Sequence, residues 1–153
     1  MSESNPWPGD HPIPVAGAIL DIGEAILDSG EEILIVRPKH LDQFWLVSGY
    51  LEAWESAEDA AIREVQEEVG LVIHRPTIVG SYSCRPIGLN MVFIVYATRV
   101  PRESQVTIGD EIAEASWWDA LLNWPIDSPA TIAVNDYLGR TRSRRQGSPS
   151  WPR

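Results

Sequence analysis

Four glutamates lie close together in the middle of this 153-residue chain. Glu64, Glu67 and Glu68 are spaced i, i+3 and i+4, which places them on one face if the segment is a helix, and Glu55 shortly precedes them. Like charges at this spacing repel one another. Clustered carboxylate oxygens are the ligands that Mg²⁺ and Mn²⁺ prefer. The pattern predicts a divalent-metal site, and the alternative is a solvated acidic helix, the usual meaning of a run of charge.

The helix that carries these glutamates has recognisable ends. Ser56 is a favoured N-cap residue, and Asp59 three positions later completes a pair similar to a capping box. Gly70 supplies the stop signal at the other end. Between them runs one apolar stripe, made of Ala61, Ile62, Val65 and Val69. We therefore expect a helix between Ser56 and Gly70, with its carboxylates at the border between core and solvent.

The segment from Gly49 to Leu71 resembles the Nudix box, G-x5-E-x7-R-E-U-x-E-E-x-G-U, in which U is a bulky aliphatic residue. The matching positions are Gly49, Glu55, Arg63, Glu64, Val65, Glu67, Glu68, Gly70 and Leu71. So many specified positions at fixed spacing are hard to meet by chance, unlike a motif of two or three residues. The resemblance covers roughly residues 14–138.

The resemblance implies a role for each charged residue of the box. In the Nudix family, the matching glutamates bind divalent cations and the matching glycine contributes backbone geometry to the site. The metal ligands that it implies here are Gly49, Glu64, Glu67 and Glu68, with Mg²⁺ or Mn²⁺ as the cofactor. The arginine that matches Arg63 pairs with a box carboxylate, here Glu55, and holds the helix against its entry loop.

The reaction that the resemblance implies is hydrolysis of a pyrophosphate bond by attack of water on phosphorus. Such an attack needs charge neutralisation, a deprotonated water and a fixed line of approach. The expected substrate is a nucleoside diphosphate linked to another moiety, such as a nucleotide sugar, a dinucleotide or a nucleoside triphosphate. The expected catalytic residues are Arg63, Glu64, Glu67, Glu68 and Glu111.

Three glutamates are candidates for the general base: Glu64 in the box, and Glu111 and Glu114 in a later segment. We favour Glu111, because it precedes Trp117 and Trp118 at the spacing seen in members similar to NADH pyrophosphatases. Ordinary loop acidity is the alternative explanation for the two later glutamates.

Four further residues are candidates for substrate binding. Arg37, Lys39 and Arg85 are basic and suited to phosphates, and Trp54 could stack on a base or a ribose. Solvent exposure or packing is the alternative for each. Many family members carry Gly where this chain has Trp54. The segment 81–91 also lacks the Gln-Pro-Trp-rich signature of NADH pyrophosphatases, so strict NADH specificity is not expected.

The composition of the chain narrows the class of binding partner that we expect. The net charge of −10 disfavours a nucleic-acid polymer, and a small nucleoside diphosphate derivative fits better. The chain shows no apolar run long enough for a membrane span and no basic-then-apolar start typical of a signal peptide. Cys84 is the sole cysteine, which excludes an internal disulfide. We expect a cytoplasmic protein, and family habit suggests a homodimer.

The remaining pattern alternates strands with helices. Strands are expected at 15–22, 25–27, 33–37, 44–47, 77–83, 90–100 and 116–118. Ser128 followed by Pro129 predicts the start of a last helix, which ends at about Leu138. The predicted class is α/β (α+β), a Nudix-type α/β/α sandwich with a mixed β-sheet between helices. The chain is predicted to divide into an N-terminal extension (1–13), a Nudix hydrolase domain (14–139) and a basic tail (140–153). The composition of the tail is typical of disorder.

Two other functions remain open at this stage. A non-catalytic Nudix-fold module would sense a nucleotide without cleaving it, although such members commonly lose box carboxylates and this chain keeps them all. An isomerase on the same fold would need a catalytic cysteine and an additional acid, and Cys84 is the one cysteine available.

Overall fold

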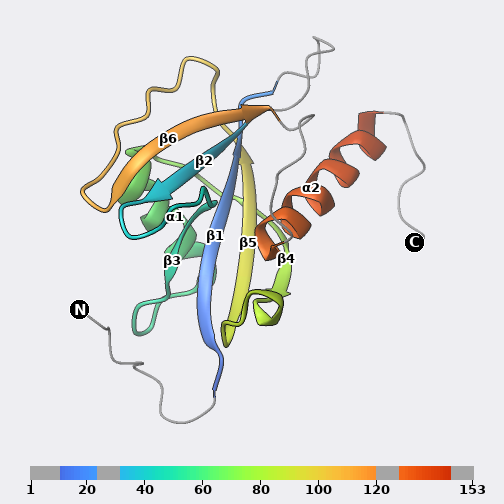
Figure 1. Ribbon diagram of the computed structural model, residues 1–153. Helices are drawn as coiled ribbons and strands as arrows, with labels where there is room; N and C mark the ends of the chain where they lie inside the picture. The colour runs from blue at the N-terminus through green and yellow to red at the C-terminus, as the bar shows by residue number, and fades with distance from the viewer. Residues whose placement is uncertain (1–10, 24–31, 120–127, 146–153) are drawn as a thin grey trace.

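Six strands and two α-helices lie in the part of the chain that the computed structural model describes, residues 11–23, 32–119 and 128–145 (Figure 1). In chain order the elements are β1 (Ile13–Asp21), β2 (Glu32–Pro38), β3 (Val47–Tyr50), α1 (Ala57–Val69), β4 (Thr77–Ser83), the 3-10 helix η1 (Arg85–Ile87), β5 (Met91–Arg99), β6 (Ile112–Asp119) and α2 (Pro129–Arg145).

The strands form one mixed sheet in the order β4-β5-β1-β2-β6, with β3 paired to β1 outside this path. β1 and β5 run parallel from the Ile13–Met91 pair to the Asp21–Arg99 pair, and the other ladders are antiparallel. β1 therefore sits at the centre of the sheet and contacts the box strand β3 directly.

Alternate residues of β1 face two separate cores, because successive side chains of a strand point to opposite faces. Ile19 packs in a cluster with Val134 of α2. Leu20 packs in a second cluster with Val65 and Val69 of α1. The two helices thus cover opposite faces of the sheet, as Figure 1 shows, and the predicted sandwich with a mixed sheet between helices is confirmed.

Two predicted boundaries are wrong. The strand expected at 44–47 lies at Val47–Tyr50 (β3). Trp45 makes a single bridge to Val36, and the ladder with β1 involves residues from Val47 onward. α2 runs to Arg145 rather than about Leu138, so residues 140–145 of the predicted tail are helical. Leu138 is the last apolar residue in the sequence of α2, and a pattern of apolar positions does not report helical turns beyond such a residue.

The other expected elements agree closely with the structure. The strand at 77–83 and the helix between Ser56 and Gly70 are confirmed, and the strand at 116–118 is the end of the longer β6. The strand expected at 25–27 and residues 146–153 lie outside the described residues, and the division into three domains stays a prediction. None of the helices in the described ranges combines the length and the apolar character that a bilayer crossing requires.

Candidate active site

α1 places its glutamates through two well-formed caps. The backbone N–H of Asp59 donates to Ser56 Oγ at 3.0 Å, which satisfies one of the free donors at the start of the helix. At the other end Gly70 adopts a left-handed φ of 71°, and its N–H donates to the carbonyl of Gln66 at 3.0 Å. Between these caps Glu64, Glu67 and Glu68 occupy the last two turns.

The backbone of β3 positions two of these glutamates. The N–H of Ser48 donates to Glu68 Oε1 at 2.9 Å. The neighbouring Gly49 has no Cβ, and a Cβ built there would overlap the Glu64 carboxylate. Glu64 can lie against the strand for that reason alone, so any larger residue at position 49 would displace it.

Arg63 connects the glutamates with the entry loop. Its Nε and Nη2 donate to the two oxygens of Glu55 at 2.8 and 2.9 Å, so the pairing expected with Glu55 is present. Its Nη1 donates to Glu64 Oε1 at 2.8 Å and to Glu67 Oε2 at 3.2 Å. The hydrogen bonds from Arg63 hold the pKa of Glu55 below its ordinary value, and the Glu55 carboxylate in turn raises the pKa of the guanidinium.

Several carboxyl groups influence one another at this end of α1. Burial raises the pKa of Glu68 to about 8, against the Ser48 N–H that lowers it, and Glu64, Glu111 and Glu67 raise it further by repulsion. Burial also raises the pKa of Glu64, with smaller contributions from Glu67 and Glu111. Glu111 therefore belongs electrostatically to the same group, although it comes from another part of the chain.

The segment that carries Glu111 is docked onto the C-terminal end of α1. The N–H groups of Thr107 and Gly109 donate to the carbonyls of Val69 and Glu68, each at 3.0 Å. A Cβ on Gly109 would overlap the carbonyl oxygen of Glu67. The carbonyl of Glu111 also accepts a 2.9 Å hydrogen bond from the N–H of Lys39. The backbone at Glu111 is thus anchored to both α1 and the end of β2.

The predicted metal ligands have the chemistry that a divalent cation prefers, and Arg63 donates hydrogen bonds to two of them, Glu64 and Glu67. Hard carboxylate oxygens suit Mg²⁺ or Mn²⁺, and the Glu64 carboxylate fits closely against Gly49. Within the described ranges, no three His, Cys, Asp or Glu side chains converge closely enough to hold an ion. Arg63 Nη1 instead bridges Glu64 and the exposed Glu67. The ligand set therefore stays a prediction.

Glu114, the alternative base, is on β6. Two of the basic substrate-binding candidates, Arg37 and Lys39, are on β2 and directly after it. Glu114 pairs with Arg37 across β6 and β2 at 3.3 Å, and Arg37 also donates to the carbonyl of Leu41 at 3.4 Å. Lys39 is exposed just beyond β2. Glu114 thus already has a cationic partner, and the choice of Glu111 as the base stays a prediction.

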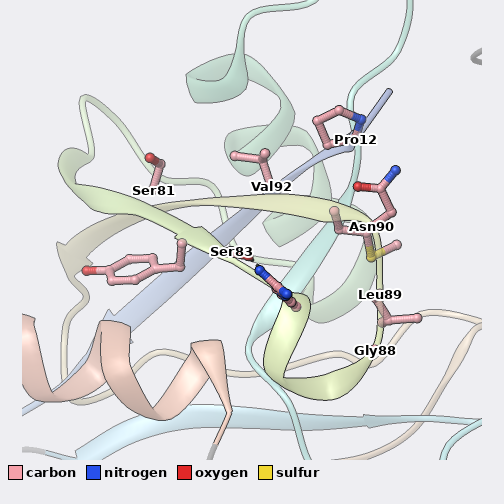
Figure 2. Close-up of a pocket in the computed structure, with 10 residues that line it drawn as sticks. Pro12, Ser81, Ser83, Gly88, Leu89, Asn90 and Val92 are labelled. Atoms are coloured by element: carbon pink, nitrogen blue, oxygen red, sulfur yellow. Dashed lines mark hydrogen bonds between the residues drawn. The ribbon is translucent and has the colours of Figure 1, made fainter. Parts of the chain in front are cut away.

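Arg85 lines an open pocket away from the box carboxylates. The pocket has a volume of about 600 Å³ and lies between the end of β4, η1, the start of β5 and the segment before β1. Figure 2 shows Ser81, Ser83, Asn90 and Pro12 around it. It offers a guanidinium, hydroxyl groups and apolar surface. The pocket and the carboxylate group are thus separate features, and only the second was expected to hold metal.

Trp54 is fully exposed on the loop between β3 and α1, where its φ is 66°. The sequence analysis did not predict this left-handed backbone. It also missed Ser48 and Gly109, which position Glu68 and the Glu111 segment. A glycine two residues before a candidate base was the available signal for Gly109, whereas a backbone donor such as Ser48 leaves no trace in side-chain patterns.

Several known proteins are similar to this chain in sequence. An NAD-capped RNA hydrolase NudC from Pseudomonas fluorescens is 34% identical over 110 residues, which cover 71% of this chain and 38% of that protein. An 8-oxo-dGDP phosphatase NUDT18 from Danio rerio is 28% identical over 120 residues, covering 76% of this chain and 35% of that protein. The chain thus spans less than half the length of these relatives.

Solved structures match the fold more completely. The NUDIX domain of Shewanella oneidensis NrtR, complexed with ADP ribose, superimposes with a TM-score of 0.71 at 16% identity, over 92% of this chain and 95% of that one. A C. elegans Ap4A hydrolase matches with a TM-score of 0.67 at 15% identity, over 86% and 98%. A family model for the NUDIX domain matches residues 20–128. With that match over most of its length, the chain belongs to the Nudix family.

Proposed function

We propose that this chain is a divalent-metal-dependent hydrolase that cleaves the pyrophosphate bond of a nucleoside diphosphate derivative. The observation that carries the proposal is that Glu64, Glu67 and Glu68 occupy the last two turns of α1, while the segment that carries Glu111 is docked on the end of the same helix. Arg63 is a single guanidinium and faces four carboxylates within 4.0 Å, those of Glu52, Glu55, Glu64 and Glu67. The excess of negative charge favours a bound cation.

Glu64, Glu67, Glu68 and the backbone of Gly49 would hold Mg²⁺ or Mn²⁺, which supplies charge neutralisation at the phosphate oxygens. Arg63 orients Glu64 and Glu67 and limits their repulsion. Glu111 takes the proton of the attacking water as the new oxygen–phosphorus bond forms and the bridging phosphorus–oxygen bond breaks. Its backbone carbonyl accepts a hydrogen bond from the Lys39 N–H, which limits the positions that its side chain can reach.

The substrate class is supported by the names of similar proteins. 8-oxo-dGDP and ADP ribose, named for two of them, both contain a nucleoside diphosphate. Arg85 stays a candidate for binding another moiety of such a substrate, and Arg37 and Lys39 stay candidates for its phosphates. A homodimer and a cytoplasmic location stay predictions.

The test is a panel of nucleoside triphosphates, nucleotide sugars and dinucleotides, assayed for phosphate or nucleoside monophosphate release with Mg²⁺ or Mn²⁺. We expect turnover that EDTA abolishes and added Mg²⁺ restores. We expect Glu67→Gln and Glu68→Gln each to lower the rate by roughly 10- to 100-fold. Glu103→Gln, at an exposed position between β5 and β6, is the matched control.

Two results would contradict the proposal. Full rate in both box variants would show that the carboxylates do not take part in turnover. Nucleotide binding without turnover by the intact protein would instead favour the sensing module.

A further inference from the structure

Trp54 occupies a backbone conformation that suits glycine and not tryptophan. It is the third residue of the turn Glu52–Glu55, which the Glu55 N–H closes by donating to the Glu52 carbonyl at 3.1 Å. Its φ of 66° is the left-handed value that Gly or Asn normally supplies at such a position. Within the described residues the other non-glycine with positive φ is Arg75. A large aromatic residue here is therefore strained.

Packing does not account for this strain. The relative exposure of Trp54 is 104%, whereas Val72, the next most exposed large apolar residue of the described part, stands at 63%. An indole with no protein atoms against it gains nothing from burial in the free protein. Strained residues that the fold itself does not need are concentrated at functional sites.

The turn that carries Trp54 is braced against the proposed catalytic group. The Glu52 N–H donates to Glu55 Oε1 at 3.0 Å, and Arg63 holds both Glu55 oxygens. The same guanidinium donates to Glu64 at 2.8 Å. Arg63 thus links the turn of Trp54 to Glu64, a predicted metal ligand. The backbone that carries the indole is held in place by these contacts without a substrate.

We infer that Trp54 is a specificity residue that stacks on the planar base of the substrate and so selects diphosphates that carry a nucleobase. The inference rests on the proposed function. The exposed carboxylate of Glu52 makes this loop unfavourable for a phosphate, whereas an uncharged ring meets no such repulsion. An aromatic face accepts any base, because every base offers a π face.

The experiment compares kcat/KM for a nucleoside diphosphate derivative with kcat/KM for a ribose diphosphate that has no base. The readout is the ratio of the two values in the wild type and in Trp54→Phe, Trp54→Leu and Trp54→Gly. Leu keeps the bulk and the strain but lacks the π face. We expect the ratio to fall about tenfold in the Leu and Gly variants, a loss within the range for one base on one aromatic ring, and to be largely kept in Phe.

The Gly variant has a second expected signature. Because glycine adopts the left-handed conformation freely, Trp54→Gly should raise Tm by roughly 2–4 °C while it lowers base selectivity. Trp54→Leu keeps the strain and should show no such rise. Val72→Ala, which alters another exposed apolar residue, is the control and should leave the ratio unchanged.

An unchanged ratio in both the Leu and the Gly variant overturns the inference, as does an equal loss in Phe and Leu. A concentration-dependent dimer that Trp54→Gly abolishes would overturn it too, since the indole would then face a second copy. If the wild type binds base-bearing diphosphates without cleaving them, the proposed function fails. The same ratio, measured with dissociation constants, still decides the role of Trp54.

Discussion

The carboxylate of Glu64 occupies the space into which a side chain at Gly49 would project. Gly49 cannot retreat from it, because it pairs with Ala16 in the central strand of the sheet. The position of a predicted metal ligand is therefore set by the absence of one methyl group on the neighbouring strand.

Gly49→Ala should reduce activity while the fold persists. The added methyl group must push the Glu64 carboxylate aside, and a shift of about 1 Å in a catalytic group can cost roughly 10²-fold in rate. Steady-state kinetics at saturating Mg²⁺ measures this, with circular dichroism as the check on folding. Gly139→Ala is the matched control, since a Cβ there has no atom within 4 Å. Equal rates for Gly49→Ala and the wild type would show that the contact has no catalytic importance.

Arg63→Lys should destabilise the protein although it keeps the charge. Lysine cannot donate to both oxygens of Glu55 and also to Glu64, so partly buried carboxylates lose their partners. We expect a loss of about 1–3 kcal/mol in the free energy of unfolding, measured with urea.

The control for that measurement is Arg37→Lys. Arg37 makes one 3.3 Å contact with Glu114, whose side chain is 53% exposed. This change should alter stability by less than about 1 kcal/mol. Similar losses at both arginines would contradict the structural importance of the Arg63 contacts.

Local signals in the sequence were sufficient for α1 and for most strands. Ser56 and Gly70 define the helix through hydrogen bonds that each cap makes with its own neighbours, so residue type alone is informative. β4 is likewise bounded as expected. The pairing of Arg63 with Glu55 followed from the resemblance, because the spacing in the box fixes it.

The parts that were not predicted depend on contacts between distant segments or on the backbone. Gly109 approaches α1 across a long separation in sequence, and the left-handed φ of Trp54 contradicts the preference of its residue type. Arg63 also reaches Glu64 and Glu67, a choice among several carboxylates that spacing does not decide. α2 continues to Arg145 although no apolar residue after Leu138 indicates it.

Gly109→Ala should lower both stability and activity. A Cβ at this position would overlap the carbonyl oxygen of Glu67, so the segment must lift from the end of α1 and carry Glu111 with it. We expect a decrease in Tm together with a decrease in kcat that exceeds any change in KM. Ile108→Ala, at the exposed neighbouring residue, controls for a general disturbance of the segment. A variant with normal kcat would argue against Glu111 as the base.

The hydrogen bond between Tyr137 and Asp21 should make stability depend on alkaline pH. The Tyr137 hydroxyl donates to Oδ2 of the fully buried Asp21 at 2.7 Å, and burial followed by this bond raises the pKa of the phenol above its ordinary value. The stabilisation is complete below the unfolded pKa of about 10 and is lost as pH rises through the folded pKa, since the unfolded chain ionises first.

Tyr137→Phe tests this relationship. It should cost about 1–3 kcal/mol at pH 8, because the Asp21 carboxylate loses one donor, and it should flatten the decline of the urea midpoint between about pH 9 and 11. Tyr82→Phe removes a bond of the same 2.7 Å length to the exposed Asp136 and should cost less, since water replaces the lost donor. If the urea midpoint of Tyr137→Phe declined with pH as in the wild type, the ionisation of Tyr137 would not limit stability at alkaline pH. Other ionisable groups would then be responsible for the decline.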